Sequence, residues 1–200
     1  MRVVLASKSP ARLAELRRAG IEPVVIPSEV DESGVVALDC EELVATLATL
    51  KARAVRDTLA IDSPTVVIGC DSMLEFGGRP FGKPGTASAA RQRWLMMRGG
   101  RGILHTGHHV RVIDDRGERA ATRTESTEVF FADLSDDEID AYVATGEPAK
   151  VAGAFTIDGY GSAFITRLIG DHHNVSGISL PLLRQTLIDL GVEWVSLWNR

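Results

Sequence analysis

The chain has 200 residues, of which 24% are charged and 44% hydrophobic, and its net charge is −5. This is the composition of an ordinary globular protein, long enough to bury a normal core as one domain or as two small lobes. We expect a single domain over residues 1–200. The negative balance argues against a nucleic-acid-coating surface, but it leaves room for a local basic pocket that binds a small anion.

Cysteine usage and hydropathy indicate a cytoplasmic protein. Cys40 and Cys70 are too few and too far apart for a disulfide framework or a zinc site, which indicates a reducing compartment. The apolar start, Val3–Ala6, is too short for the core of a signal peptide. No apolar run approaches the roughly 18 residues of a membrane span. We therefore expect no membrane partner.

The first strand, Val3–Ala6, leads directly into a helix start. In residues 7–12 (Ser-Lys-Ser-Pro-Ala-Arg), Ser9 fits the N-cap and Pro10 fits the first helical position. Backbone N–H groups and hydroxyls at such a start, with Arg12 nearby, suit a bound phosphate. Ser-Pro helix starts are also common without a ligand, so an ordinary capped helix is the alternative.

An acidic loop and a long helix follow a second strand at Ile21–Pro27. The loop, Ser28–Ser33, carries three carboxylates in four residues, which could ligate a hard divalent cation or could simply be solvated. The helix is expected over Glu41–Leu59. Lys51 falls one residue past its apolar face, near enough to extend toward a cleft.

A buried strand at Thr65–Ser72 is the centre of the predicted fold. β-Branched residues between Pro64 and Gly69 favour a strand, and Asp71 and Ser72 follow at its expected end. Open α/β sheets bind ligands at the carboxyl edge of their strands, so Asp71 is a candidate functional residue. A strand-ending aspartate that only caps a turn is the competing interpretation.

The remaining elements follow from periodicity and capping. Residues 77–84, from Gly77 to Pro84, nearly match the pattern of a phosphate-binding P-loop, but Pro84 stands where such a loop needs Ser or Thr. Lys83 can still meet a phosphate as a point charge. We further expect helices at 86–98, from Ser135 to near Gly146 and at 180–190, and strands at 103–113 and 123–131 joined by a hairpin turn.

Two adjacent histidine pairs stand out as candidate metal ligands. His108 and His109 lie on a predicted strand, where neighbouring side chains point to opposite faces, so they make a poor metal pair. The same interpretation applies to His172 and His173.

The glycine-studded segment 151–161 has side chains small enough for a planar ligand to approach its backbone.

Taken together, these stretches resemble the Maf family of nucleotide pyrophosphatases. The matching segments lie in family order: residues 5–10 with Arg12, Glu29–Glu32, Lys51-Ala52, Gly69–Ser72, Gly82–Pro84, His105–Gly107, Tyr142–Pro148, Ala152-Gly153 with Ile157–Gly159, and Asn174 with Gly177. Each segment is weak alone, but the ordered set covers nearly the whole chain and is specific.

The resemblance implies a fold, a reaction and a set of site residues. The fold would be α/β, with a mixed, elongated and curved sheet flanked by helices and two lobes around a cleft. The reaction would be metal-dependent hydrolysis of a nucleoside triphosphate to a monophosphate and pyrophosphate, using Mg²⁺ or Mn²⁺. A homodimer is a possible assembly. The implied residues are Asp71, Lys51 and Lys83 for catalysis, Glu32 and Asp71 for metal, and Ser7, Ser9, Arg12, Ser72 and Asp158 for substrate.

The chain departs from the family pattern where the substrate base is chosen. The family's Ser-Pro-Arg-Arg has Ala11 in place of its first arginine, its Ala-Asp-Thr is Cys70-Asp71-Ser72, and its Ile-Gln-Gly is Ile157-Asp158-Gly159. The branch acting on 7-methyl-GTP carries an acidic residue at the position of Asp158. Two alternatives therefore stay open: a 7-methyl-GTP-selective enzyme, and a nucleotide-binding regulatory module without turnover.

Overall fold

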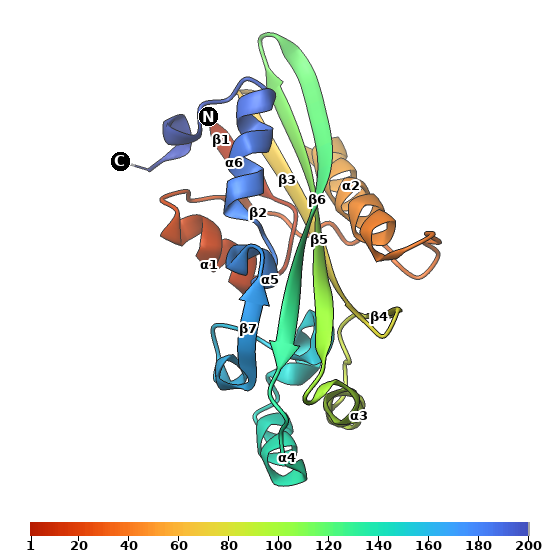
Figure 1. Ribbon diagram of the computed structural model, residues 1–200. Helices are drawn as coiled ribbons and strands as arrows, with labels where there is room; N and C mark the ends of the chain where they lie inside the picture. Colours follow the sequence, from red (N-terminus) through yellow and green to blue (C-terminus); the bar gives the residue numbers. More distant parts are fainter. Residues whose placement is uncertain (200) are drawn as a thin grey trace. The chain divides into compact units, whose positions relative to one another are not determined.

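A computed structural model describes residues 1–199 and has an α/β architecture (Figure 1). Arg200, the last residue of the predicted domain, lies outside the described residues. The strands are β1 (Arg2–Leu5), β2 (Val24–Val25), β3 (Thr65–Phe76), β4 (Arg79–Phe81), β5 (Arg101–Asp114), β6 (Gly117–Phe131) and β7 (Ile165–Ile169). The α-helices are α1 (Pro10–Arg18), α2 (Cys40–Thr58), α3 (Ala87–Met97), α4 (Asp136–Ala144), α5 (His172–Val175) and α6 (Leu180–Asp189). Short 3₁₀ helices are η1 (Pro148–Lys150), η2 (Ala152–Ala154), η3 (Tyr160–Phe164) and η4 (Trp194–Leu197).

The strands form one mixed sheet, which confirms the predicted fold class. Their order is β2-β1-β3-β5-β6-β7, and β4 pairs with β3 beside this path. β1 runs parallel to both β2 and β3, whereas β4 and β7 are antiparallel to their partners. Among the described residues no helix is long and apolar enough to cross a membrane.

The described chain divides into two compact units. Unit 1 contains residues 1–71, 106–125 and 177–199, and unit 2 contains residues 72–105 and 126–176. The three strands β3, β5 and β6 each contribute residues to both units. The single domain and the cleft between two lobes stay predictions.

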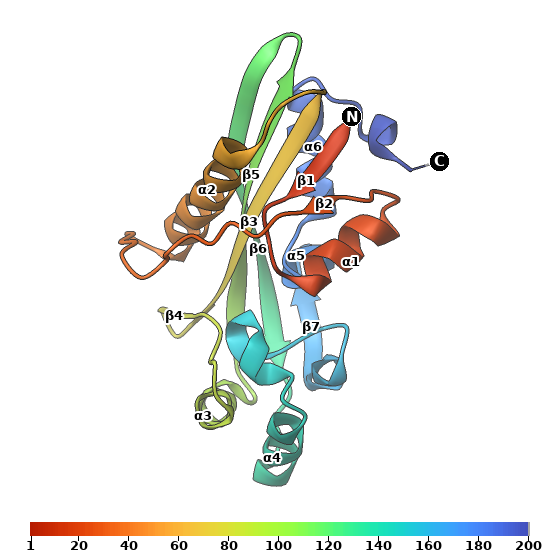
Figure 2. The same ribbon diagram turned by 180° about the vertical axis from the view of Figure 1, so that it is seen from behind.

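Unit 1 has an apolar core on each face of its part of the sheet. Ile68 and Cys70 pack on one face with Leu16 of α1 and Leu183 of α6, and all four side chains are fully buried. On the other face Val67 packs against Ala52 and Val55 of α2. Helices α1 and α6 therefore cover one face and α2 covers the other (Figure 2).

Unit 2 is built around one tryptophan. The ring of Trp94 on α3 makes edge contacts with Phe131, Tyr142 and Phe164, at centroid distances of 5.6–5.9 Å. Its indole N–H donates to Ala154 O at 2.7 Å, which satisfies the polar atom of a fully buried side chain. This contact ties α3 to the glycine-studded segment.

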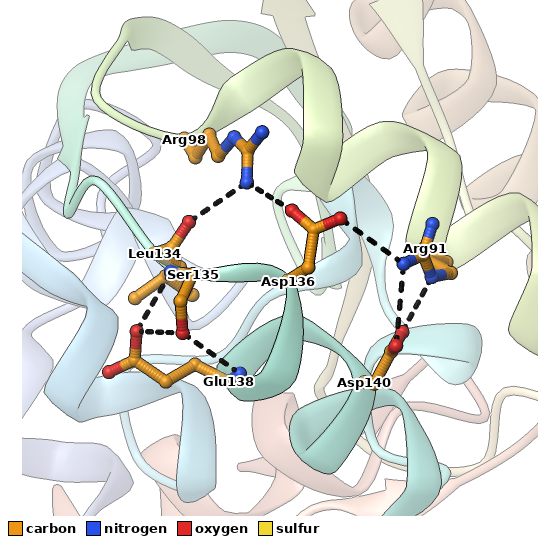
Figure 3. A network of polar contacts seen from close by, with 7 residues as sticks. All are labelled: Arg91, Arg98, Leu134, Ser135, Asp136, Glu138 and Asp140. Carbon is orange, nitrogen blue, oxygen red and sulfur yellow. Dashed lines mark hydrogen bonds and ion pairs between the residues drawn. The ribbon is translucent and has the colours of Figure 1, made fainter.

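Ion pairs and a capping box fix the start of α4 beside α3 (Figure 3). Arg98 donates to Asp136 at 2.6 Å and Arg91 to Asp140 at 2.5 Å. Ser135 and Glu138 complete the capping box that their spacing predicts, each side chain receiving the other's backbone N–H.

Most predicted elements are confirmed, and three differ in length. Helices α1, α2, α3, α4 and α6 lie within a residue or two of their predicted bounds. The second strand is reduced to Val24–Val25, and the second arm of the hairpin begins at Gly117 rather than at Arg123. The central strand continues to Phe76, because its last residues pair with β4.

Candidate active site

The predicted catalytic residue Asp71 belongs to a cluster of three charged side chains. The Lys51 ammonium on α2 donates to Asp71 Oδ1 at 2.5 Å and lies 2.7 Å from Glu32 Oε1. The Lys51 and Asp71 side chains are only 12% and 11% exposed, whereas Glu32 is 49% exposed. One lysine thus joins the acidic loop to the central strand.

Two glycines allow α2 to lie directly on the sheet at this point. A Cβ at Gly69 would lie 2.4 Å from Ala48 O, and a Cβ at Gly107 would lie 2.2 Å from Val44 O. Gly69 and Asp71 share a face of β3 because side chains alternate along a strand. The glycine therefore lets the helix approach closely enough for Lys51 to reach Asp71.

Burial dominates the ionisation of Asp71. Loss of solvent raises the pKa of this carboxyl, while the positive charges of Lys51 and Arg12 act in the opposite direction. The net direction is upward from the ordinary value. Asp71 is consequently a stronger base than an exposed aspartate.

The start of α1 has the capping that the sequence predicts, and phosphate binding there stays a prediction. Ser9 is the N-cap and accepts from the backbone N–H of Arg12, and Gly20 takes a positive φ of 82° just past the helix end. Ser7 Oγ accepts from Ser9 N at 3.2 Å and from Arg12 Nη1 at 3.0 Å. Hydroxyls, N–H groups and a guanidinium thus converge at one helix end.

The Arg12 side chain is anchored as well as charged. It is only 9% exposed, and its Nε donates to Gly177 O at 2.7 Å. Gly177 takes a positive φ of 102°, a conformation that glycine adopts without strain. The positive φ explains why a glycine supplies the carbonyl that Arg12 contacts.

The other predicted residues belong to unit 2. Ser72 is half-buried on β3, and Lys83 is exposed in the segment after β4. The Lys83 segment is held by its backbone: Gly82 O accepts from Arg93 and from Gly153 N, and Gly85 N donates to Ala149 O at 3.0 Å. A cation on a fixed loop is suited to meet an anion.

Asp158 is exposed, and the residues on both sides of it are anchored by one carboxylate. Glu147 accepts from Tyr142 Oη at 2.8 Å, from Thr156 Oγ1 at 2.6 Å, and from the N–H groups of Tyr160 and Gly161 at 3.0 Å. Burial alone would raise the pKa of Glu147, but these hydrogen bonds outweigh it and lower the pKa. Nothing in the sequence pattern around Glu147 indicates this role.

The prediction that Asp71 ends its strand is wrong. Asp71 lies within β3, which continues to Phe76, whereas its parallel neighbour β1 ends at Leu5, opposite Ile68. The carboxylate is therefore placed beyond the end of the neighbouring strand rather than beyond the end of its own. The competing interpretation, an aspartate that caps a turn, fails for the same reason.

The donors in this cluster fit a hard divalent cation. Glu32 and Asp71 offer carboxylate oxygens, which Mg²⁺ and Mn²⁺ prefer, and both contact one ammonium. Two carboxylates and one lysine leave the cluster with an excess of negative charge when all three are ionised. Such a cluster attracts a further cation more readily than it attracts a bare triphosphate.

The two histidine pairs differ in surroundings. His108 Nε2 accepts from Ser179 N at 2.8 Å, and His109 Nδ1 lies 2.7 Å from Thr122 Oγ1. Burial, together with Arg111 and Arg53, lowers the pKa of His109 to about 4. Both are core histidines of β5. His172 and His173 instead begin the short helix α5.

Comparison with known proteins gives one family. The family described as "Maf-like protein" matches residues 2–190. A curated relative from Cutibacterium acnes (strain DSM 16379 / KPA171202), named "Nucleoside triphosphate pyrophosphatase", is 59% identical, and the alignment covers 98% of this chain and 94% of the relative. A relative of the same name from Salinispora tropica (strain ATCC BAA-916 / DSM 44818 / JCM 13857 / NBRC 105044 / CNB-440) is 53% identical, with 100% and 88% covered.

Solved structures are more distant. "The structure of the Staphylococcus aureus Ham1 protein" aligns with a TM-score of 0.44 at 15% identity and covers 99% of this chain and 94% of that chain. A likeness of this degree carries no weight here. The family match over residues 2–190 and the identity to relatives along nearly their whole length show the family. The chain belongs to the Maf-like protein family.

Proposed function

We propose that this chain is a nucleoside triphosphate pyrophosphatase, which hydrolyses its substrate to a nucleoside monophosphate and pyrophosphate. The names of its relatives support the activity. The observation that carries the assignment of residues is the Lys51 ammonium held between Asp71 and Glu32 at 2.5 and 2.7 Å.

Asp71 is the proposed general base. A catalytic base works best when its pKa lies near the working pH, and burial moves the pKa of Asp71 in that direction. In this role the carboxylate orients the attacking water and takes its proton. Lys51, which touches the same carboxylate, fixes its position and adds positive charge for the phosphates.

The other proposed roles divide between phosphates and base. A triphosphate carries about four negative charges, so its hydrolysis needs cations and hydrogen-bond donors around it. Ser7, Ser9, Arg12, Ser72 and Lys83 are the proposed substrate contacts, in addition to Lys51. Glu32 and Asp71 would hold Mg²⁺ or Mn²⁺. When bound, such a cation neutralises phosphate charge and makes a water molecule more acidic.

Replacing the proposed base tests the catalytic role. Asp71→Asn keeps the size of the side chain and removes its charge, and we expect kcat to fall at least about 100-fold, the scale of general base catalysis. Because the folded protein disfavours the charged form of Asp71, the free energy of unfolding at pH 7 should not fall with it. The measurements are pyrophosphate release and thermal unfolding.

The matched control is Asp62→Asn, which changes an exposed aspartate and should leave kcat unchanged. An Asp71→Asn protein that is folded and hydrolyses at the wild-type rate would remove Asp71 from the mechanism. If the wild type binds nucleotides but releases no pyrophosphate with Mg²⁺ or Mn²⁺, the chain is a binding module instead.

Asp158 is proposed to influence base choice. A carboxylate only accepts hydrogen bonds, and guanine offers two adjacent donors, whereas uracil and thymine offer one donor between two acceptors. We expect Asp158→Gln to lower kcat/KM for GTP and 7-methyl-GTP relative to UTP and dTTP. If the ratios do not change, Asp158 is only a turn residue before Gly159.

A further inference from the structure

Only two of the five histidines can meet a solute from solution. His105, His108 and His109 on β5 are 4%, 0% and 4% exposed. His172 is exposed, and the side chain of His173 is 27% exposed. Both directly follow Asp171, so two accessible imidazoles and a carboxylate occur in three consecutive residues of unit 2.

The side chains of these three residues converge. The rings of His172 and His173 lie 3.8 Å apart between centroids and are tilted by 36°. His173 Nδ1 lies 3.0 Å from Asp171 Oδ1. One ligand atom from each residue can be chosen so that all three lie within 4.8 Å of one another. Two ligands bound at about 2.1 Å to one ion are themselves separated by about 3.0–3.4 Å, so the side chains would have to draw closer by rotation when an ion binds.

The backbone beneath the cluster is fixed to the sheet. Asp171 is the N-cap of α5 and accepts from His173 N, and its carbonyl accepts from Thr127 Oγ1 at 2.8 Å. The next residue, Asn174, is fully buried and donates to Leu104 O at 3.0 Å and to Thr127 Oγ1 at 3.1 Å. A turn held by β5 and β6 presents its ligands with little loss of conformational freedom on binding.

We propose that Asp171, His172 and His173 form a binding site for a borderline transition-metal cation such as Zn²⁺ or Ni²⁺. Imidazole nitrogens prefer these ions, whereas carboxylate oxygens alone prefer Mg²⁺ and Mn²⁺. The site thus differs in donors and in residues from Glu32 and Asp71. It also reverses the sequence interpretation of His172 and His173 as a poor pair, because a helix start places the two rings together where a strand would separate them.

Calorimetric titration of the full chain with Zn²⁺, without nucleotide, tests the site. At this site the wild type should bind one equivalent, and the double variant His172→Gln, His173→Gln should bind that equivalent at least tenfold more weakly. Any Zn²⁺ held by Glu32 and Asp71 would be a separate equivalent that the double variant keeps. Asp171→Asn, which retains an N-cap oxygen, should also weaken binding. Glu32→Gln is the matched control and should leave this binding unchanged, while 1 mM Mg²⁺ should not displace Zn²⁺.

Nuclear magnetic resonance of the imidazole protons provides a second readout. Ni²⁺ at less than one equivalent should broaden the signals of His172 and His173 and spare those of the three buried histidines. The proposal is overturned if the wild type binds no Zn²⁺, if the double variant binds it as tightly as the wild type, or if Glu32→Gln removes the binding. His172→Gln changes only an exposed side chain and should leave the protein folded. Weaker Zn²⁺ binding by this single variant would therefore reflect the loss of a ligand rather than unfolding.

Discussion

At the scale of single residues, the candidate site depends on a balance between burial and charge at Asp71. Its carboxylate is largely withdrawn from water, which raises its pKa, and two cations only partly offset that effect. The ion pair between Lys51 and Glu32 contributes little to stability, because the Glu32 side chain is half exposed to solvent. In the Lys51–Asp71 contact both side chains are nearly buried, so loss of the lysine would remove the ion-pair partner of a nearly buried carboxylate, whereas Lys51 keeps Glu32 when Asp71 is replaced.

Removing either proposed phosphate lysine should affect all substrates alike. We expect Lys51→Ala and Lys83→Ala each to lose about 2–4 kcal/mol of transition-state stabilisation, the scale for one preorganised electrostatic partner. The phosphates carry no base identity, so the loss should be equal for GTP, UTP and dTTP. Steady-state kcat/KM on the three nucleotides measures it.

Lys150→Ala, which changes another exposed lysine, is the control and should be neutral. A lysine variant that altered only the preference among bases would show that the residue lies at the other end of the substrate.

At the scale of elements, the distance between α2 and β3 decides whether the charged cluster can form. Gly69 and Gly107 leave no room for a side chain beneath the helix; Ala48 and Ala52 of α2 lie against Gly69, and the backbone of Val44 and Ala45 lies against Gly107. Small residues on both elements thus bring the backbones together. Lys51, next to Ala52, can then reach Asp71.

Adding one methyl group at Gly69 should test this packing. In Gly69→Ala the new Cβ would meet Ala48 O at 2.4 Å, which backbone movement must relieve. We expect the free energy of unfolding to fall by about 1–3 kcal/mol, and kcat/KM to fall at temperatures where the variant is still fully folded. Gly34→Ala, with no atom within 4 Å of the new Cβ, is the matched control. Full activity in a folded Gly69→Ala protein would show that catalysis does not depend on the distance between α2 and β3.

Local signals predicted most of these elements, and long-range pairing accounts for the differences. Ser9 and Pro10 mark the start of α1 through capping alone. The length of β3 depends on its pairing with β4, which no local pattern encodes. Strand β7 was not predicted, although β-branched residues at Ile165, Thr166 and Ile169 were an available signal.

The candidate site was predicted to a similar extent. Local patterns single out Lys51, Asp71 and the loop that contains Glu32, the family resemblance assigns their roles, and the structure brings the three side chains together. The contact of Arg12 with Gly177 joins residues 165 positions apart, so sequence spacing could not indicate it. The four donors to Glu147 likewise come from three separate places in residues 142–161, and only the folded chain shows that they meet at one carboxylate.

At the scale of the whole molecule, the proposed residues are distributed over both compact units. Ser7, Ser9, Arg12, Glu32, Lys51 and Asp71 belong to unit 1, and Ser72, Lys83 and Asp158 belong to unit 2. Asp71 and Ser72 are neighbours on β3, at the residue where the assignment changes from one unit to the other. The family match spans residues 2–190 and therefore includes both units.

The products of nucleotide turnover test the central claim most directly. The purified chain is incubated with a panel of nucleoside triphosphates and Mg²⁺ or Mn²⁺, and the products are quantified by ³¹P nuclear magnetic resonance. The proposed activity predicts one nucleoside monophosphate and one pyrophosphate for each substrate consumed, without nucleoside diphosphate. Release of nucleoside diphosphate and orthophosphate, or binding without turnover under every condition, would contradict it.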